Sequence, residues 1–294
     1  MTILKVRHVT TYRYGRPVAF GEHRMMFRPR DSYDQRLLGS SLRIMPKPSG
    51  LRWVHDAFGN AVALARFDAM ADELTFESRI EVDHFPDPIG FESEDFAKTY
   101  PFSYAEDELP DLAPFMARQH PDPEGELARW ARRFLGPGQE TATGRLLMTL
   151  TTAVGESFAY NRRTETGTQG PLTTLRLGRG TCRDFALFMI EAVRSLGLAA
   201  RFVSGYLYVP THDGTSHLGG GSTHAWCQVY IPGAGWVEFD PTNGIIGNRD
   251  LIRVAVARTP AQAVPLSGTF RGTPTDERGM TVDVQVTSED GPGD

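Results

Sequence analysis

The chain of 294 residues suits one large domain or two modest ones, and 40% of its residues are hydrophobic, enough for a sizeable core. Its 30 glycines and 20 prolines are too few for a low-complexity or disordered protein. The formal net charge of −5 comes without a basic patch, which argues against a nucleic-acid-binding protein.

The sequence also lacks the patterns of a membrane or secreted protein. The longest apolar run, at residues 185–190, is far shorter than the roughly 18 residues of a membrane helix. The opening stretch MTILKVRHVTTYRY alternates in polarity and does not form the apolar segment of a signal peptide. Two cysteines, Cys182 and Cys227, cannot form a disulfide framework. We therefore expect a cytoplasmic protein with reduced thiols.

Alternating polarity predicts β-strands over the first ninety residues. Even positions from 4 to 14 form one face of a strand, which we expect to end at Gly15 and Pro17. A second alternation covers residues 74–82, and the DAFGN stretch at 56–60 predicts a hairpin loop. Several short strands separated by turns predict an antiparallel β-sandwich or barrel. Alternating valines at 282–286 predict a last strand that rejoins a sheet.

Helical periodicity begins after residue 123. Apolar stripes predict three helices followed by three strands, the helices near residues 127–134, 146–158 and 185–196, the strands at 200–209, 225–231 and 236–240. Prolines crowd the segment before the first helix and predict an irregular connector, because proline fixes φ and lacks an N–H. We divide the chain into a β-rich domain at 1–90, a connector at 91–122, a core at 123–250 and a C-terminal extension at 251–294.

A cysteine stands at the predicted start of the third helix. Thr181, Cys182 and Asp184 fit a capping box, with Thr181 as N-cap and an acidic residue three positions later. A thiol in the first turn of a helix faces free backbone N–H groups and the positive end of the helix dipole, and both stabilise the thiolate. Cys182 is therefore a candidate nucleophile, with a buried structural cysteine as the alternative.

Two partners for this thiol lie on neighbouring predicted strands. His224 begins one strand, Asp240 ends the next, and a glycine-containing turn at 233–235 joins them. This hairpin places an imidazole beside a carboxylate, the base and orienting group of a thiol acyl-transfer enzyme. Alternation puts Cys227 on the face opposite His224, so we expect it in the core. Glu238 shares a face with Asp240 and is a lesser candidate for the orienting role.

These segments resemble a known family. The stretches GRGTCRDFALFMIEAVRSLGLAARFVSGYL and STHAWCQVYIPGAGWVEFDPTN resemble the bacterial transglutaminase-like proteins, which are described as cysteine proteases. The stretches TTYRYGRPVAFGEHRMMFRPR and HDAFGNAV resemble the β-rich N-terminal region that accompanies this core in bacteria. The resemblance extends from about residue 3 to residue 250.

The resemblance implies an α+β fold and a Cys-His-Asp triad. The fold would combine an N-terminal antiparallel β-sandwich-like domain with a papain-like core, in which the cysteine begins a helix packed on an antiparallel sheet. Cys182 would be the nucleophile, His224 the base and then the acid, and Asp240 the orienting group. The implied substrate is a peptide or isopeptide amide of the glutamine type. Water or an amine acceptor would resolve the thioester. We expect no cofactor, and neither a nucleic acid nor a membrane as a partner.

The oxyanion site departs from the animal members of the family. Those enzymes carry a tryptophan upstream of the cysteine, whereas here no tryptophan lies between Trp130 and Cys182. The backbone N–H of Cys182 is the expected first donor, and Tyr160 and Gln169 are alternatives for the second.

Metal binding is not expected. No acidic loop resembles an animal-type calcium site. His212, Asp213 and His217 precede His224, but the three histidines lack the paired spacing of zinc ligands.

A peptide-binding module on the same fold is the alternative to an enzyme. Its sign would be a missing member of the triad, and none is missing. A disulfide oxidoreductase is disfavoured because there is no Cys-x-x-Cys pair. Hydrolysis is favoured modestly over amine transfer, while the substrate and the oligomeric state stay open.

Overall fold

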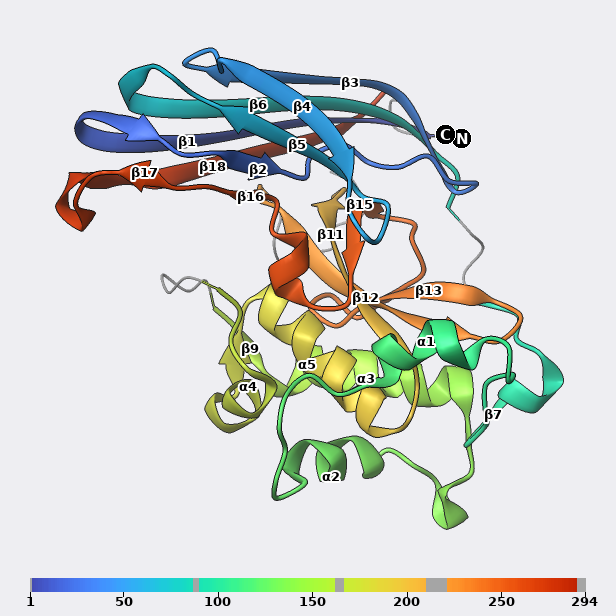
Figure 1. Ribbon diagram of the computed structural model, residues 1–294. Helices are drawn as coiled ribbons and strands as arrows, with labels where there is room; N and C mark the ends of the chain where they lie inside the picture. The colour runs from blue at the N-terminus through green and yellow to red at the C-terminus, as the bar shows by residue number, and fades with distance from the viewer. Residues whose placement is uncertain (1, 87–89, 162–166, 210–220, 290–294) are drawn as a thin grey trace.

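The computed structural model describes residues 2–86, 90–161, 167–209 and 221–289. The chain forms three layers, with a β-sandwich above a central antiparallel sheet and helices below that sheet (Figure 1). The α+β fold class predicted from the sequence is therefore confirmed.

The upper layer is built from the two ends of the chain. Its strands are β1 (Thr2–Phe20), β2 (His23–Met25), β3 (Gln35–Met45), β4 (Gly50–His55), β5 (Ala61–Arg66), β6 (Met70–His84), β16 (Leu266–Ser267), β17 (Phe270–Arg271) and β18 (Glu277–Ser288). One sheet has the order β17-β1-β6-β3, with β18 also paired to β1, and the other has the order β16-β2-β5-β4. Phe76 of the first sheet and Met25 of the second are fully buried in the cluster between them.

The predicted end of the first strand was wrong. β1 passes through Gly15 and Pro17 and ends at Phe20, while its pairing with β6 is interrupted between Arg13 and Val18. Such an irregularity absorbs turn-like residues without ending a strand. Val18 and Phe20 are both buried in the sandwich core, and their burial stabilises the continuation.

The predicted strand near the C-terminus is confirmed. β18 runs antiparallel to β1, with Val284 opposite His8 and Val286 opposite Val6. The DAFGN stretch joins β4 to β5 as the predicted hairpin, and the alternation at 74–82 lies within β6. The four predicted domain ranges remain a prediction, and the residues after 250 contribute strands to both the central sheet and the sandwich.

The central sheet contains the three predicted strands and two more. Its strands are β11 (Ala200–Leu207), β12 (His224–Ile231), β13 (Gly235–Asp240), β14 (Ile245–Ile246) and β15 (Leu251–Ala257). They are all antiparallel, in the order β14-β13-β12-β11-β15. Tyr206 and Ile252 pack against Leu4 and Val6 of the sandwich. The sheet therefore forms the contact between the sandwich and the helical layer.

The helical layer surrounds one central helix, α5 (Cys182–Ser195). The other helices are α1 (Leu109–Met116), α2 (Glu126–Arg132), α3 (Thr143–Ser157) and α4 (Pro171–Leu177). Short strand pairs and 3-10 turns connect them and the later strands: β7 (Thr99–Tyr100), β8 (Thr141–Ala142), β9 (Ala159–Tyr160), β10 (Arg179–Gly180), η1 (Asp95–Ala97), η2 (Pro137–Gln139), η3 (Pro260–Ala263) and η4 (Pro274–Asp276). The three predicted helices are confirmed as α2, α3 and α5. None of the helices within the described ranges is both long and apolar enough to cross a membrane.

The proline-rich connector contains a helix that the sequence did not predict, and it is attached to α5. Glu191 and Arg194 are buried in α5 and require polar partners there. The Glu191 carboxylate accepts from the N–H of Gln119 at 3.2 Å and pairs with Arg194 at 2.9 Å. Arg194 also donates to the carbonyl oxygen of Phe115 at 2.8 Å. These contacts hold the end of α1 and the residues after it against the central helix.

One glycine permits the close approach of three strands beside the candidate site. A Cβ atom at Gly205 of β11 would collide with the carbonyl oxygen of Ile252 and lie 2.7 Å from Cη2 of Trp226. We therefore expect Gly205→Ala to lower the free energy of unfolding by about 1–3 kcal/mol in urea titrations. Gly50→Ala, in β4 where a Cβ has no neighbour within 4 Å, is the matched control and should change it by less than about 0.5 kcal/mol. If both substitutions changed the free energy of unfolding by the same small amount, this close packing at Gly205 would be contradicted.

Candidate active site

The start of α5 presents the candidate nucleophile. Cys182 is the first residue of the helix and is 7% exposed. The Asp184 carboxylate accepts from the backbone N–H of Thr181 at 2.8 Å and from its hydroxyl at 2.9 Å, which confirms the predicted capping box. Its other oxygen accepts from the N–H of Gln169 at 2.6 Å. One buried carboxylate thus holds both the helix start and the chain before it.

Hydrogen-bond donors and a cationic side chain surround the start of α5. A thiol at this position faces the free N–H groups of the first turn. Arg183 is next in sequence, and its guanidinium donates to the carbonyl oxygen of Pro260 at 2.8 Å and lies 4.8 Å from the ring centroid of Phe202. Burial lowers the pKa of Arg183, while negative charge on Cys182 and Asp184 raises it.

The hairpin of β12 and β13 brings His224 and Asp240 together. His224 Nε2 lies 2.8 Å from Asp240 Oδ2, and both side chains are fully buried. The carboxylate also accepts from the backbone N–H of Thr242 at 2.9 Å and from Asn243 Nδ2 at 2.8 Å. Three donors therefore hold the carboxylate in one orientation. Sequence reasoning missed this role for Thr242 and Asn243, although both stand within three residues after Asp240 in the DPTN stretch.

The pKa shifts of both members of this pair favour their charged forms. Burial by itself would lower the pKa of His224, but Asp240 and then Cys182 outweigh it and raise the pKa of His224 to about 10. Burial by itself would raise the pKa of Asp240, but the charge of His224 and the hydrogen bonds from His224, Asn243 and Thr242 lower it below its usual range. The pair is a buried imidazolium-carboxylate contact.

The second ring nitrogen of His224 is available to the thiol. Nδ1 is buried and has no well-formed hydrogen bond within the described part of the chain. The Cys182 side chain is close enough to interact with the ring, since it contributes to the raised pKa of His224. With Nε2 held by Asp240, Nδ1 is the nitrogen that can exchange a proton with sulfur.

Two lesser candidates have other roles. Cys227 is fully buried in the cluster around α5, as expected, and its thiol donates to the carbonyl oxygen of Phe239 at 3.4 Å. Burial raises the pKa of this thiol well above its usual value. Glu238 accepts from Gln228 Nε2 at 2.6 Å and pairs with Arg253. Asp240, rather than Glu238, contacts His224.

The two predicted alternatives for the second oxyanion donor both lie in the chain before α5. Gln169 Nε2 donates to Thr174 Oγ1 at 2.9 Å and to the carbonyl oxygen of Arg179 at 3.0 Å, so its amide hydrogens support the chain before α5. Tyr160 lies in β9, directly opposite Gly180 of β10, two residues before Cys182. The choice of the second oxyanion donor stays a prediction.

The histidine-containing loop lies outside the described residues, including His212, Asp213 and His217. Within the described ranges, no three His, Cys, Asp or Glu side chains gather as a metal-binding group.

Two parts of the chain match known families. Residues 4–83 match the bacterial transglutaminase-like N-terminal region. Residues 128–241 match the transglutaminase-like superfamily and include Cys182, His224 and Asp240. Both parts of the resemblance drawn from the sequence are confirmed.

Individual proteins also resemble this chain over all or part of its length. Rv2569c, an uncharacterized protein of Mycobacterium tuberculosis, is 28% identical over 302 residues that span 96% of this chain and 91% of that protein. ML0607 of Mycobacterium leprae is 33% identical over 113 residues, which span 38% of this chain and 40% of that protein. A crystal structure described as "a Putative Cysteine Protease from Cytophaga hutchinsonii" covers 100% of this chain and 92% of its own, with a TM-score of 0.72 and 19% identity. This last likeness confirms the fold.

The raised pKa of His224 can be tested by NMR titration of its imidazole. We expect a pKa of about 10 in the wild type. Asp240→Asn should lower this pKa, because the amide keeps the shape of the carboxylate but removes its negative charge. Asp95→Asn removes a carboxylate that is 96% exposed and serves as the control. An unchanged pKa of His224 in Asp240→Asn would show that the carboxylate is not the cause.

Proposed function

We propose that this chain, with its transglutaminase-like core, is a cysteine enzyme that acts on peptide or isopeptide amides of the glutamine type through a thioester. The observation that carries the proposal is the buried 2.8 Å contact between His224 Nε2 and Asp240. It leaves His224 Nδ1 to the thiol of Cys182, which stands at a helix start where a thiolate is stabilised.

The first half-reaction moves the acyl group to sulfur. It starts from the thiolate-imidazolium pair, in which His224 Nδ1 already holds the proton of Cys182 Sγ. The thiolate attacks the amide carbonyl carbon. A C–S bond forms while the C=O π electrons move to oxygen. The backbone N–H of Cys182 and the hydroxyl of Tyr160 donate to this oxyanion. When the electrons return, the C–N bond breaks, and His224 gives its proton to the departing nitrogen.

The second half-reaction resolves the thioester. His224 Nδ1 accepts a proton from water, and the water oxygen attacks the thioester carbon. The C–S bond then breaks, which releases a carboxylic acid and restores the thiolate-imidazolium pair. An amine in place of water yields a new amide by the same electron movements. Hydrolysis is the reaction that we favour.

Asp240 supports both half-reactions without touching the substrate. It holds the imidazole so that Nδ1 rather than Nε2 faces the sulfur, and its charge stabilises the imidazolium that forms. General acid-base catalysis of this kind contributes roughly 100-fold to 10,000-fold to a rate.

Turnover of glutamine peptides tests the proposal directly. We expect the wild type to release ammonia, and mass spectrometry to detect an acyl adduct on Cys182. Cys182→Ser should lose at least about 1,000-fold in kcat/KM, because the hydroxyl is a far weaker nucleophile beside the same base. Cys227→Ser is the matched control and should retain activity. A labelled primary amine in a parallel reaction separates transfer from hydrolysis.

Two outcomes would contradict an enzyme. Turnover that persists in a purified Cys182→Ser protein would exclude the thiol as nucleophile. Peptide binding without turnover or adduct formation would instead establish the non-catalytic peptide-binding module.

Alkylation by iodoacetamide tests the nucleophile without a substrate. At pH 7 we expect Cys182 to react faster than Cys227, whose burial raises its pKa. His224→Ala should slow Cys182 by about 10-fold or more, because the imidazolium no longer stabilises the thiolate. Cys182→Ser reports the rate of Cys227 alone. A Cys182 rate that does not respond to His224→Ala would exclude the thiolate-imidazolium pair.

A further inference from the structure

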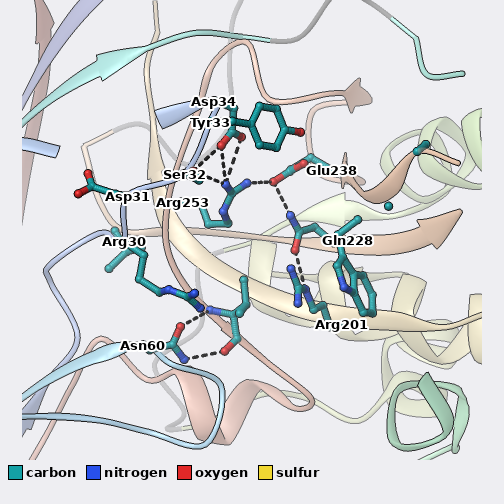
Figure 2. A pocket seen from close by; sticks show the side chains of 15 residues that line it. Arg30, Asp31, Ser32, Tyr33, Asp34, Asn60, Arg201, Gln228, Glu238 and Arg253 are labelled. Atoms are coloured by element: carbon teal, nitrogen blue, oxygen red, sulfur yellow. Dashed lines mark hydrogen bonds and ion pairs between the residues drawn. The ribbon is translucent and has the colours of Figure 1, made fainter. Parts of the chain in front are cut away.

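A polar cavity of about 320 Å³ lies between the central sheet and the loops of the sandwich (Figure 2). Cys182, His224 and Asp240 are not among its lining residues. It is nevertheless on the same face of β12 as His224. Gln228, which lines the cavity, stands four residues after His224, and side chains an even number of residues apart share a face of a strand. At about 3.3 Å per residue, the two positions are about 13 Å apart. The cavity is therefore a separate feature beside the candidate active site.

Most charged groups around this cavity are already paired. Arg253 donates to Asp34 at 2.9 Å and also pairs with Glu238, as the dashed lines in Figure 2 show. Asp34 accepts a further hydrogen bond from Asn248 Nδ2 at 2.8 Å. Asp31 accepts from the backbone N–H of Leu37 at 2.6 Å. The three carboxylates and Arg253 thus have partners within the protein.

Arg201 is the exception. Its Nε donates to Gln228 Oε1 at 2.7 Å, and its guanidinium lies 4.1 Å from the ring centroid of Trp236. Its two terminal amino groups make no hydrogen bond, and no carboxylate lies within ion-pair distance, among the described residues. Burial and the charges of Arg253 and Arg30 lower the pKa of Arg201 to about 9, although Glu238 opposes this shift. A guanidinium in such surroundings lacks an anion.

A second arginine lines the same cavity. Arg30 donates to the carbonyl oxygen of Phe58 at 2.9 Å and has no carboxylate partner among the described residues. Val254, Val256 and Trp236 supply apolar lining. Two guanidinium groups that have no carboxylate partner among the described residues therefore face one space, together with an apolar wall. This space is large enough for a small molecule.

We propose that this cavity binds a small monocarboxylate with an apolar substituent, through the free edge of Arg201 and with Arg30 as a second donor. The planar guanidinium matches a carboxylate with two parallel hydrogen bonds. Asp31, Asp34 and Glu238 also line the cavity and repel a second negative charge, so a monoanion suits it better than a phosphate dianion. The apolar substituent packs against the valines and the indole ring.

Isothermal titration calorimetry with N-acetyl-leucine and isovalerate tests the site without any enzymatic assay. N-acetyl-leucine represents a peptide C-terminus, and isovalerate represents a free organic acid. Binding of N-acetyl-leucine but not of isovalerate identifies a peptide C-terminus as the ligand. The neutral N-acetyl-leucinamide should bind at least 10-fold more weakly.

Variants connect the binding to the named groups. Arg201→Gln should weaken acid binding at least 10-fold, and Arg201→Lys should weaken it less, because it keeps the charge but not the planar fork. Arg30→Gln should have a smaller effect. Arg52→Gln, which alters an arginine of β4 that is 58% exposed, is the control and should bind like the wild type.

Three results would overturn the proposal: equal affinity for acid and amide, tighter binding of inorganic phosphate than of either acid, or unchanged acid binding in Arg201→Gln. Thermal unfolding establishes that each variant is folded. If Arg201→Gln does not fold, unchanged acid binding in both Arg201→Lys and Arg30→Gln would overturn the proposal equally.

Discussion

The burial of α5 is the constraint on which the other parts of the structure depend. Almost every residue of this helix is inside the protein, including Asp184, Glu191 and Arg194. A buried charge is tolerated only when it is paired and hydrogen-bonded. Asp184 meets this requirement at the helix start, where it orders the residues beside Cys182. Glu191 and Arg194 meet it through the proline-rich segment, which is thereby packed against the helix.

The central sheet also buries charged groups that need partners, on the side of the site opposite α5. The His224-Asp240 pair lies fully inside the protein, so its attraction must offset the cost of removing two charges from water. Asp240 reduces this cost by accepting from Thr242 and Asn243. The ends of two adjacent strands and the start of a helix, each held by its own buried carboxylate, are thus brought to one place.

The sandwich does more than cover the central sheet. It contacts the sheet through an apolar cluster that includes Leu4 and Tyr206, and through the ion pair between Asp34 and Arg253. The cavity beside Arg201 lies where these layers meet. Its residues come from the N-terminal loops and from β11, β12, β13 and β15, so the cavity exists only when the two parts are packed together. The N-terminal region therefore shapes the surroundings of the core.

Local patterns in the sequence by themselves determined the strands and helices with clear periodicity, the capped helix start at Cys182, and the hairpin that carries His224 and Asp240. These features depend on residues close in the chain, whose spacing sets which face they share. Only the tertiary structure decided that β1 continues past Gly15, because that depends on apolar contacts with a second sheet. It also decided the position of α1 and the grouping of Arg30, Arg201 and Arg253. Those contacts join residues tens to hundreds of positions apart, and no local periodicity encodes such a distance.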